Sequence, residues 1–457
     1  MLLNNLIKKL IRTKNWYCRF LGYLRCPLLF FFFIPIKGAF GSHEAYVTTI
    51  VQDGSSRLLL EQRKRLLENL GGYFKRNDFP HRLSESVFND EGWGNLSIRY
   101  TLDSDLQERA ERILKSYRPD IGVVVMMDAL SGDILAMASY QREVGEPATT
   151  VLKKLSGPVN WVLDSILPAA SLFKIVTASA AIEKAGFSER DIVTFSGGNY
   201  TLYRRNLLAP SSQMGMRRAT LRDAFALSYN TPFGRLAIYN LQPEDLLEYS
   251  KKFGFNSKIV CELPFDMGET IIPLEKGFAL AEISSGFNRI TKISPIHAAM
   301  IAASIANDGK MILPNLVKDI FDSEGNRIYS RDTITLGEVV GFDAAQKLKS
   351  LMQATIERGT SRKAFRRIYH WFKLSGIEVG GKTGSITAEA PLGKVDWFVG
   401  FGLKNDTNQR IAIAAVTLHK DRWHVKPSDL AREMLSFYFY GNAHPRRYLI
   451  RKLVTRQ

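Results

Sequence analysis

Ser171 and Lys174 form the first of three short groups whose residue types suit serine acyl transfer. On a helix, side chains at this spacing lie one turn apart on the same face. A serine hydroxyl is a poor nucleophile until a base takes its proton, and a lysine held in a dry site near other cations can have a pKa low enough to be that base. We interpret Ser171 as the candidate nucleophile and Lys174 as its base, although an N-cap serine beside a surface lysine is the simpler explanation of this pair taken alone.

The second group is Ser228-Tyr229-Asn230, at the boundary between two stretches of helical pattern. A second serine can relay a proton to a leaving amine, and an asparagine can hydrogen-bond the amide of a substrate. Helix-cap residues explain the same two side chains equally well. This group therefore indicates a catalytic site only in combination with the other two groups.

The third group is Lys382-Thr383-Gly384-Ser385, which follows a pair of glycines. A strand of small residues beside a cleft lets a substrate backbone pair along it. Lys382 would supply positive charge, and the hydroxyls of Thr383 and Ser385 could hold a carboxylate. The stretch from Gly376 to Thr383 also fits a loose phosphate-loop pattern, but the residues after it lack the helical periodicity that such a loop needs.

The elements that must position these groups are strands at both ends of a helical middle. Two apolar runs joined by a glycine turn, 121–127 and 134–139, predict a β-hairpin. The end of the chain returns to strands at 379–385, 397–403 and 411–418, before a closing helix at 427–440. Between them we predict helices at 105–117, 171–185, 221–228, 243–253, 294–307 and 343–357. This order predicts an α/β protein of the α+β type, with one antiparallel sheet built from both ends and covered by helices.

The start of the chain has the pattern of an export signal. Residues 1–25 are basic, and an apolar run at 26–36 follows them, which predicts a signal peptide or membrane anchor over 1–41. We interpret 42–100 as a linker or small pedestal, 101–440 as the catalytic domain and 441–457 as a basic tail.

The net charge of +17 is concentrated near the two ends, which favours a membrane or envelope surface over a nucleic-acid groove. The sequence has neither a zinc-ligand spacing nor a basic–aromatic RNA-binding signature, and we expect no nucleic-acid partner.

With the three groups in this order, the chain resembles the penicillin-binding transpeptidase family over about residues 100–440. The motifs of this family are a serine–lysine pair, a serine–asparagine pair and a lysine–threonine–glycine strand. Six further stretches carry the resemblance: Tyr100 to Gln107, Val124 to Asp128, Ser131 to Ala138, Ala302 to Gly309, Glu357 to Thr360, and Asp396 to Phe401.

The resemblance implies a five-stranded antiparallel sheet with helices on both faces plus a helical subdomain, as in penicillin-binding transpeptidases and β-lactamases. It implies that Ser171 is the nucleophile, Lys174 the base, and Ser228 a proton shuttle assisted by Lys382. The substrate-binding residues that it implies are Asn230, Thr383, Gly384 and Ser385, with the backbone N–H groups of Ser171 and Ser385 as the oxyanion hole.

The activity implied by the resemblance is peptidoglycan D,D-transpeptidation in the bacterial envelope, outside the cytoplasm and at the inner membrane. The implied partners are peptidoglycan stem peptides, β-lactams, the membrane through the N-terminal segment, and proteins of a cell-wall synthesis complex. No metal or organic cofactor is required by this chemistry.

Two departures qualify the resemblance. Ala170 precedes the candidate nucleophile, where glycine is usual in the family. No glycosyltransferase motif precedes residue 100, so the chain resembles the monofunctional, class B-like members, yet its stretch before the domain is shorter than their typical pedestal.

Other functions use the same motifs. A D,D-carboxypeptidase differs only in using water as the acceptor. A serine β-lactamase needs a positioned deacylating group, and no Glu-x-x-Asn segment lies between Ser228 and Lys382. A β-lactam sensor would need a signalling module, and a non-catalytic envelope scaffold would not need three intact motifs.

Overall fold

The structure is a computed structural model. It describes residues 66, 68–70, 85–90, 94–142, 159–209, 215–259, 261–389, 392–420 and 422–443. The predicted signal or anchor over 1–41, most of the predicted linker, and most of the basic tail lie outside these residues. Within the described part of the chain, no helix is long and apolar enough to span a membrane.

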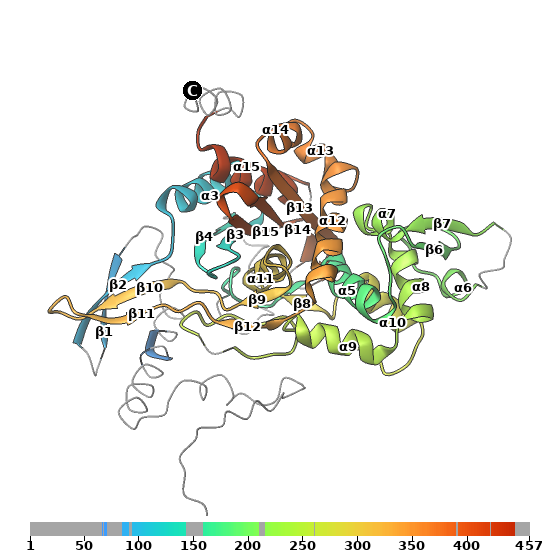
Figure 1. The fold of residues 1–457 in the computed structure, drawn as a ribbon, viewed down its shortest axis with the longest axis horizontal. Helices are drawn as coiled ribbons and strands as arrows, with labels where there is room; N and C mark the ends of the chain where they lie inside the picture. Colours follow the sequence, from blue (N-terminus) through green and yellow to red (C-terminus); the bar gives the residue numbers. More distant parts are fainter. Residues whose placement is uncertain are drawn as a thin grey trace, which may run out of the picture. The chain divides into compact units, whose positions relative to one another are not determined.

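A five-stranded antiparallel sheet lies at the centre, in the order β13-β14-β15-β3-β4 (Figure 1). Its strands are β3 (Ile121–Asp128), β4 (Ile134–Gln141), β13 (Ile377–Glu389), β14 (Leu392–Lys404) and β15 (Gln409–His419). Residues 121–128 pair with 411–418, which lie close to the other end of the chain. The predicted sheet, built from both ends of the domain, is confirmed.

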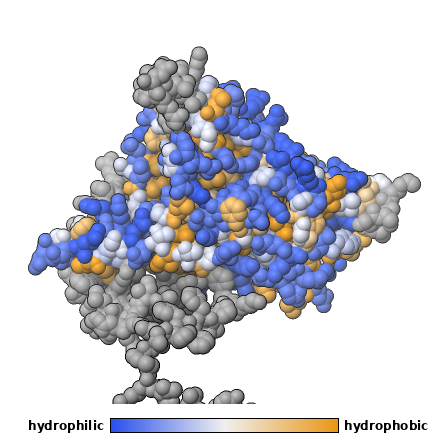
Figure 2. Space-filling view, viewed as in Figure 1, coloured by the Kyte–Doolittle hydropathy of each residue, from blue (hydrophilic) through white to orange (hydrophobic). Residues whose placement is uncertain are grey.

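Alternating side chains let this sheet bury both faces, as a pleated strand requires. Along β15, Ala412, Ala414 and Val416 join one apolar cluster, whereas Ile411 and Ile413 join the other. Helix α11 (Pro295–Ala306) packs against β14, β15 and β3 on one side, and α3 (Ser104–Tyr117) and α15 (Pro427–Tyr440) pack against the sheet on the other. Helices therefore cover both faces, as predicted. Figure 2 shows a mostly hydrophilic surface on the side in view.

Helix α11 shows how the sequence fixes an element of the core. The side chain of Ser294 accepts a hydrogen bond from the backbone N–H of His297, and Pro295 occupies the first turn. All twelve residues of the helix are buried. This agrees with the predicted cap and explains why the stretch is apolar all round.

A helical subdomain lies beside the sheet, between β4 and β13 in sequence. Its longer helices are α5 (Lys174–Lys184), α8 (Asn230–Asn240), α9 (Pro243–Lys252), α10 (Phe278–Ser285) and α12 (Phe342–Glu357). Its shorter helices are η1 (Ala170–Phe173), α6 (Arg204–Leu207) and α7 (Leu221–Ala226). Two further short helices, α13 (Arg362–Phe365) and α14 (Tyr369–Leu374), pack instead against α15 and β13 on the face of the central sheet. Three strand pairs accompany the subdomain: β5 (Leu167–Pro168) with β8 (Lys292–Ile293), β6 (Ile192–Phe195) with β7 (Arg217–Thr220), and β9 (Lys310–Ile312) with β12 (Thr335–Glu338).

A second sheet has the order β1-β2-β10-β11 and joins two distant parts of the chain. Strands β1 (Glu85–Asp90) and β2 (Gly94–Tyr100) lie in the segment interpreted as linker or pedestal, where we predicted no strand. β1 pairs with β2, and β2 pairs with β10 (Val317–Phe321), which forms a hairpin with β11 (Arg327–Ser330), as Figure 1 shows.

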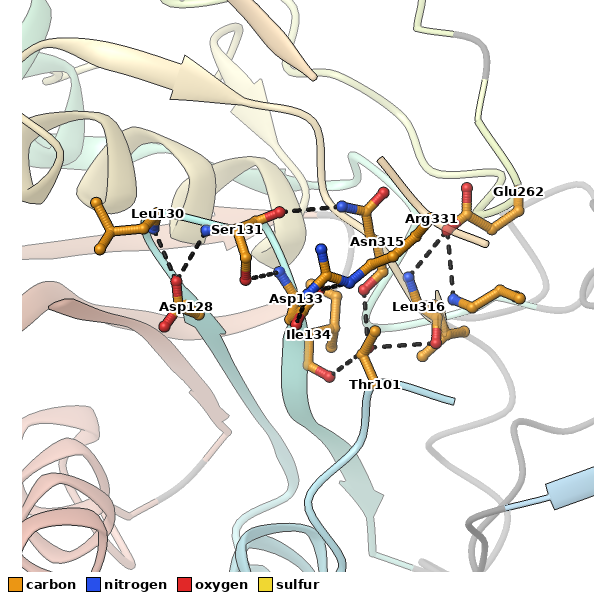
Figure 3. Close-up of polar contacts among 11 residues, drawn as sticks. Thr101, Asp128, Leu130, Ser131, Asp133, Ile134, Glu262, Asn315, Leu316 and Arg331 are labelled. Atoms are coloured by element: carbon orange, nitrogen blue, oxygen red, sulfur yellow. Dashed lines mark hydrogen bonds and ion pairs between the residues drawn. The ribbon is translucent and has the colours of Figure 1, made fainter. Parts of the chain in front are cut away.

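Thr101 lies where this second sheet meets the central one (Figure 3). Its hydroxyl oxygen is 2.8 Å from the carbonyl oxygens of Ile134 and Asn315. Nearby, the Glu262 carboxylate is 2% exposed and accepts hydrogen bonds from the N–H groups of Leu316 and Val317 at 3.0 and 3.3 Å. Together with the backbone bonds from Thr101 N–H to the Leu316 carbonyl and from Ile134 N–H to the Asn315 carbonyl, these buried side chains tie the connection between the two sheets to both of them.

We predict that Thr101→Val lowers the free energy of unfolding by about 1–3 kcal/mol, because the isosteric side chain lacks the hydroxyl proton that Thr101 donates to these buried carbonyl oxygens. Urea denaturation of the purified protein measures this change. Thr335→Val, at an exposed strand position, is the matched control and should have a smaller effect. Equal effects of the two variants would contradict the assigned role of Thr101.

Candidate active site

Ser171 lies in the short helix η1, immediately before α5. The chain enters this turn through β5, and the indole N–H of Trp397 in the central sheet donates to the Pro168 carbonyl at 2.9 Å. Ala170 has a φ of +49°, in the left-handed region that non-glycine residues seldom adopt. The serine is therefore held at a strained turn that is anchored to the sheet.

The ammonium nitrogen of Lys174 is the meeting point of three acceptors. It lies 2.8 Å from Ser171 Oγ, 2.7 Å from Asn230 Oδ1 and 2.5 Å from the carbonyl oxygen of Ser285. The side chain has no exposed surface. Burial, and to a lesser degree the charge of Lys382, lower the pKa of Lys174 well below its usual value, so that deprotonation to a neutral amine costs far less than in water.

The second group lies between α7 and α8. Ser228 has a φ of +57°, and its hydroxyl oxygen accepts a hydrogen bond from Lys382 Nζ at 2.8 Å. Asn230 begins α8, and its amide nitrogen donates to the Tyr200 carbonyl at 2.7 Å. That bond turns the amide oxygen toward Lys174, which uses it as an acceptor.

The third group lies on β13, an edge strand of the central sheet. Lys382 has no exposed surface, and besides Ser228 its ammonium donates to the Thr383 carbonyl at 2.7 Å. Burial lowers the pKa of Lys382 to about 7. The phosphate-loop alternative is wrong, because this lysine lies inside a strand of thirteen residues and opens no helix.

Gly384 brings this strand close to the nucleophile. A Cβ atom at position 384 would lie 3.2 Å from the Ala169 carbonyl oxygen and 3.4 Å from the Ser171 nitrogen. On the other side of the turn, a Cβ atom at Gly286 would lie only 1.9 Å from the Ala170 carbonyl oxygen. Two glycines thus permit the close approach of three backbone segments around Ser171.

The hydroxyls of Thr383 and Ser385 already have partners on the protein. Thr383 Oγ1 lies 2.6 Å from Thr360 Oγ1, and the Ser385 hydroxyl donates to a carboxylate oxygen of Asp396. The other oxygen of Asp396 accepts from the indole N–H of Trp423 at 2.6 Å.

The structure thus brings Ser171, Lys174 and Asn230 into one hydrogen-bonded group, and Ser228 with Lys382 into another. It adds contacts that we did not predict, from the Ser285 carbonyl, the Tyr200 carbonyl, Thr360, Asp396 and Trp423. Thr360 and Asp396 lie in stretches that carry the family resemblance, which is the only sequence signal that points to them.

Comparison with known families decides the classification. Residues 122–433 match the family described as penicillin binding protein transpeptidase domain. The chain belongs to this family. The matched range contains all three groups, so the buried lysines, the two serines and the β13 strand are parts of a penicillin-binding transpeptidase domain.

Curated relatives are distant in sequence. The chain is 24% identical over 347 residues to penicillin-binding protein PbpB of Mycobacterium tuberculosis, covering 69% of this chain and 47% of that protein. It is 25% identical over 317 residues to peptidoglycan D,D-transpeptidase PbpA of Mycolicibacterium smegmatis, covering 65% of this chain and 62% of that protein. The chain therefore spans about half to three fifths of the length of these relatives.

Solved structures share the fold. The D,D-transpeptidase domain of a peptidoglycan glycosyltransferase from Eggerthella lenta aligns with a TM-score of 0.59 at 24% identity, over 78% of this chain and 90% of that one. The crystal structure of PBPA from Mycobacterium tuberculosis aligns with a TM-score of 0.60 at 21% identity, over 76% and 83%. Together with the sheet order, these similarities confirm the predicted transpeptidase fold.

The lowered pKa of Lys382 has a consequence for stability. An unfolded lysine has a pKa of about 10.4, whereas burial lowers that of Lys382 to about 7. Between these values the unfolded chain binds more protons than the folded one, so this residue makes the folded state more stable as pH rises.

We therefore predict that Lys382→Met raises the free energy of unfolding relative to wild type most strongly below about pH 7, and that this advantage shrinks toward about pH 10. Urea denaturation at several pH values measures the difference. Lys363→Met, at an exposed position, should show no such trend. A pH-independent difference for Lys382→Met would contradict the assignment.

Proposed function

We propose that this chain is a peptidoglycan D,D-transpeptidase that forms an acyl-enzyme at Ser171. The observation that carries the proposal is the 2.8 Å contact between Ser171 Oγ and Lys174 Nζ, because that lysine is fully buried. Its lowered pKa favours the neutral amine that a general base requires. The family membership established above narrows the chemistry to that of penicillin-binding transpeptidases.

In the proposed acylation, Ser171 Oγ attacks the carbonyl carbon of the penultimate D-alanine of a stem peptide while its proton passes to Lys174 Nζ. The C–N bond to the terminal D-alanine then breaks. Ser228 gives the leaving amine a proton, and Lys382 resupplies it through the contact of 2.8 Å between Lys382 Nζ and Ser228 Oγ. With a pKa of about 7, Lys382 can both hold and release that proton near neutral pH.

The donor peptide would lie along the free edge of β13. Asn230 would hydrogen-bond its amide, and Thr383 and Ser385, with Gly384 between them, would receive its terminal group. The N–H groups of Ser171 and Ser385 would form the oxyanion hole. The closeness of Gly384 to the Ser171 nitrogen supports this arrangement, because the two donors then come from adjacent segments.

An amine from a second stem peptide would resolve the acyl-enzyme and regenerate Ser171. Water as the acceptor would make the protein a D,D-carboxypeptidase, and fast hydrolysis of a penicilloyl adduct would make it a β-lactamase. The relatives named peptidoglycan D,D-transpeptidase favour the first of these outcomes. They also support an envelope location outside the cytoplasmic membrane, with the N-terminal segment as signal or anchor.

β-Lactam binding follows from the same chemistry. Penicillin-binding protein A of Mycobacterium tuberculosis has been solved as acyl-enzyme complexes with imipenem and with penicillin G. We expect a fluorescent penicillin to acylate Ser171 and to remain attached for minutes or longer. Ser171→Ala should abolish the labelling, read out by gel fluorescence and by intact mass.

The matched control is Ser179→Ala. Ser179 lies on the helix after the nucleophile, and its hydroxyl bonds only within that helix, to the Ile175 carbonyl at 2.8 Å. This variant should label like the wild type. Labelling that persists in Ser171→Ala would refute the proposed nucleophile, and a correctly folded wild-type protein that takes no label would favour a non-catalytic scaffold.

The reaction products show whether an amine or water resolves the acyl-enzyme. We predict that wild-type protein incubated with stem peptides that carry a free acceptor amine releases D-alanine and forms cross-linked dimers in comparable amounts, as mass spectrometry would show. D-Alanine release without dimers would favour a carboxypeptidase. Rapid turnover of penicillin without a lasting adduct would favour a β-lactamase.

A further inference from the structure

Asp396 faces Ser385 across the two strands that border the candidate site. The two residues are directly paired in the β13–β14 ladder. The Ser385 hydroxyl donates to one Asp396 oxygen, and the Trp423 indole donates to the other at 2.6 Å. Both carboxylate oxygens therefore have donors, and the side chain is held toward Ser385 from two sides.

This hydrogen bond determines what Ser385 can offer to a ligand. A serine hydroxyl has one proton and two lone pairs, while an ionised carboxylate can only accept. While the Ser385 proton points to Asp396, the oxygen presents lone pairs alone to the cleft. A ligand carboxylate cannot take a hydrogen bond from that oxygen, whereas a ligand amide N–H can give one to it.

The charges beside the strand act in the same direction. Asp396 places a negative charge next to the position where the proposed donor terminus would lie, and like charges disfavour each other. Arg289 lies beside the same strand, but its Nε donates to the Thr387 carbonyl at 2.7 Å and lies 3.9 Å from a Glu389 oxygen. Part of its capacity to bind an anion is therefore already used.

We propose that Asp396 is a specificity-determining residue that lowers the preference of the site for an anionic donor terminus. The site then discriminates less between a terminal carboxylate and a neutral carboxamide than the two hydroxyls alone would. The proposal rests on the proposed function, because it places the donor terminus at Thr383 and Ser385.

The test uses two thioester donors that are identical except for the terminal group, one a carboxylate and the other its carboxamide. Thiol release in the full chain gives the second-order rate constant for acylation of Ser171 by each. Asp396→Ala should raise the carboxylate-to-carboxamide ratio of these constants by about tenfold, the effect expected when one hydrogen bond to a charged group is gained. An unchanged or lower ratio would overturn the proposal.

Two further variants separate this effect from a general disturbance of the strand. Asp396→Asn keeps the shape of the side chain and removes only its charge, so it should raise the ratio in the same direction by a smaller factor. Asp105→Ala removes a carboxylate at an exposed position in the first turn of α3 and should leave the ratio at its wild-type value. A change of the same size in Asp105→Ala would overturn the assignment to Asp396.

A double-mutant cycle tests the contact itself. Ser385→Ala should lower the rate with the carboxylate donor about tenfold more in the Asp396→Ala background than in the wild type, because only there is the hydroxyl free to donate. Equal losses in both backgrounds would overturn the mechanism. Absence of any acyl adduct at Ser171 in the wild type, with either donor, would instead refute the proposed function.

Discussion

The burial of two lysine ammonium groups, Lys174 and Lys382, is the constraint on which the arrangement of the site depends. Neither has exposed surface, and a buried charge is tolerated only with acceptors around it or after loss of its proton. The acceptors come from segments far apart in the chain: Ser171, Asn230, the Ser285 carbonyl and Ser228. The elements that carry them must therefore meet closely.

That meeting requires backbone conformations that the chain would not otherwise favour. Ala170 and Ser228, beside and within the two serine motifs, both have positive φ values, and each costs of order 1–3 kcal/mol. Contacts elsewhere hold them in place, such as the bond from the buried Trp397 indole to the Pro168 carbonyl. The stable sheet thus maintains a site whose charges and turns are individually unfavourable, which is the usual relation between stability and activity.

The central sheet could be predicted because β3, β4, β14 and β15 contain apolar runs, and α11 could be predicted because Ser294 and Pro295 mark its start. The eight predicted site residues stand in compact motifs, so their types and spacing could be recognised. The pairing of β10 with β2 was not predicted, because neither segment had been predicted as a strand. The role of the Ser285 carbonyl as an acceptor could not be predicted from the sequence either, since every residue type has a backbone carbonyl oxygen. Asp396 lies opposite Ser385 because of the register between β13 and β14, and no local sequence pattern predicts that register.

Ala170 shows how two of the motifs constrain each other. Its positive φ explains why glycine suits this position, because a side chain there is strained. The methyl group of Ala170 points toward β13, since a Cβ atom at position 384 would lie 3.3 Å from it. The glycine at position 384 therefore leaves room for the alanine that precedes the nucleophile. The alanine that replaces the usual glycine before Ser171 is accommodated by Gly384 of the third motif. Positions 170 and 384 together determine the space between Ser171 and β13.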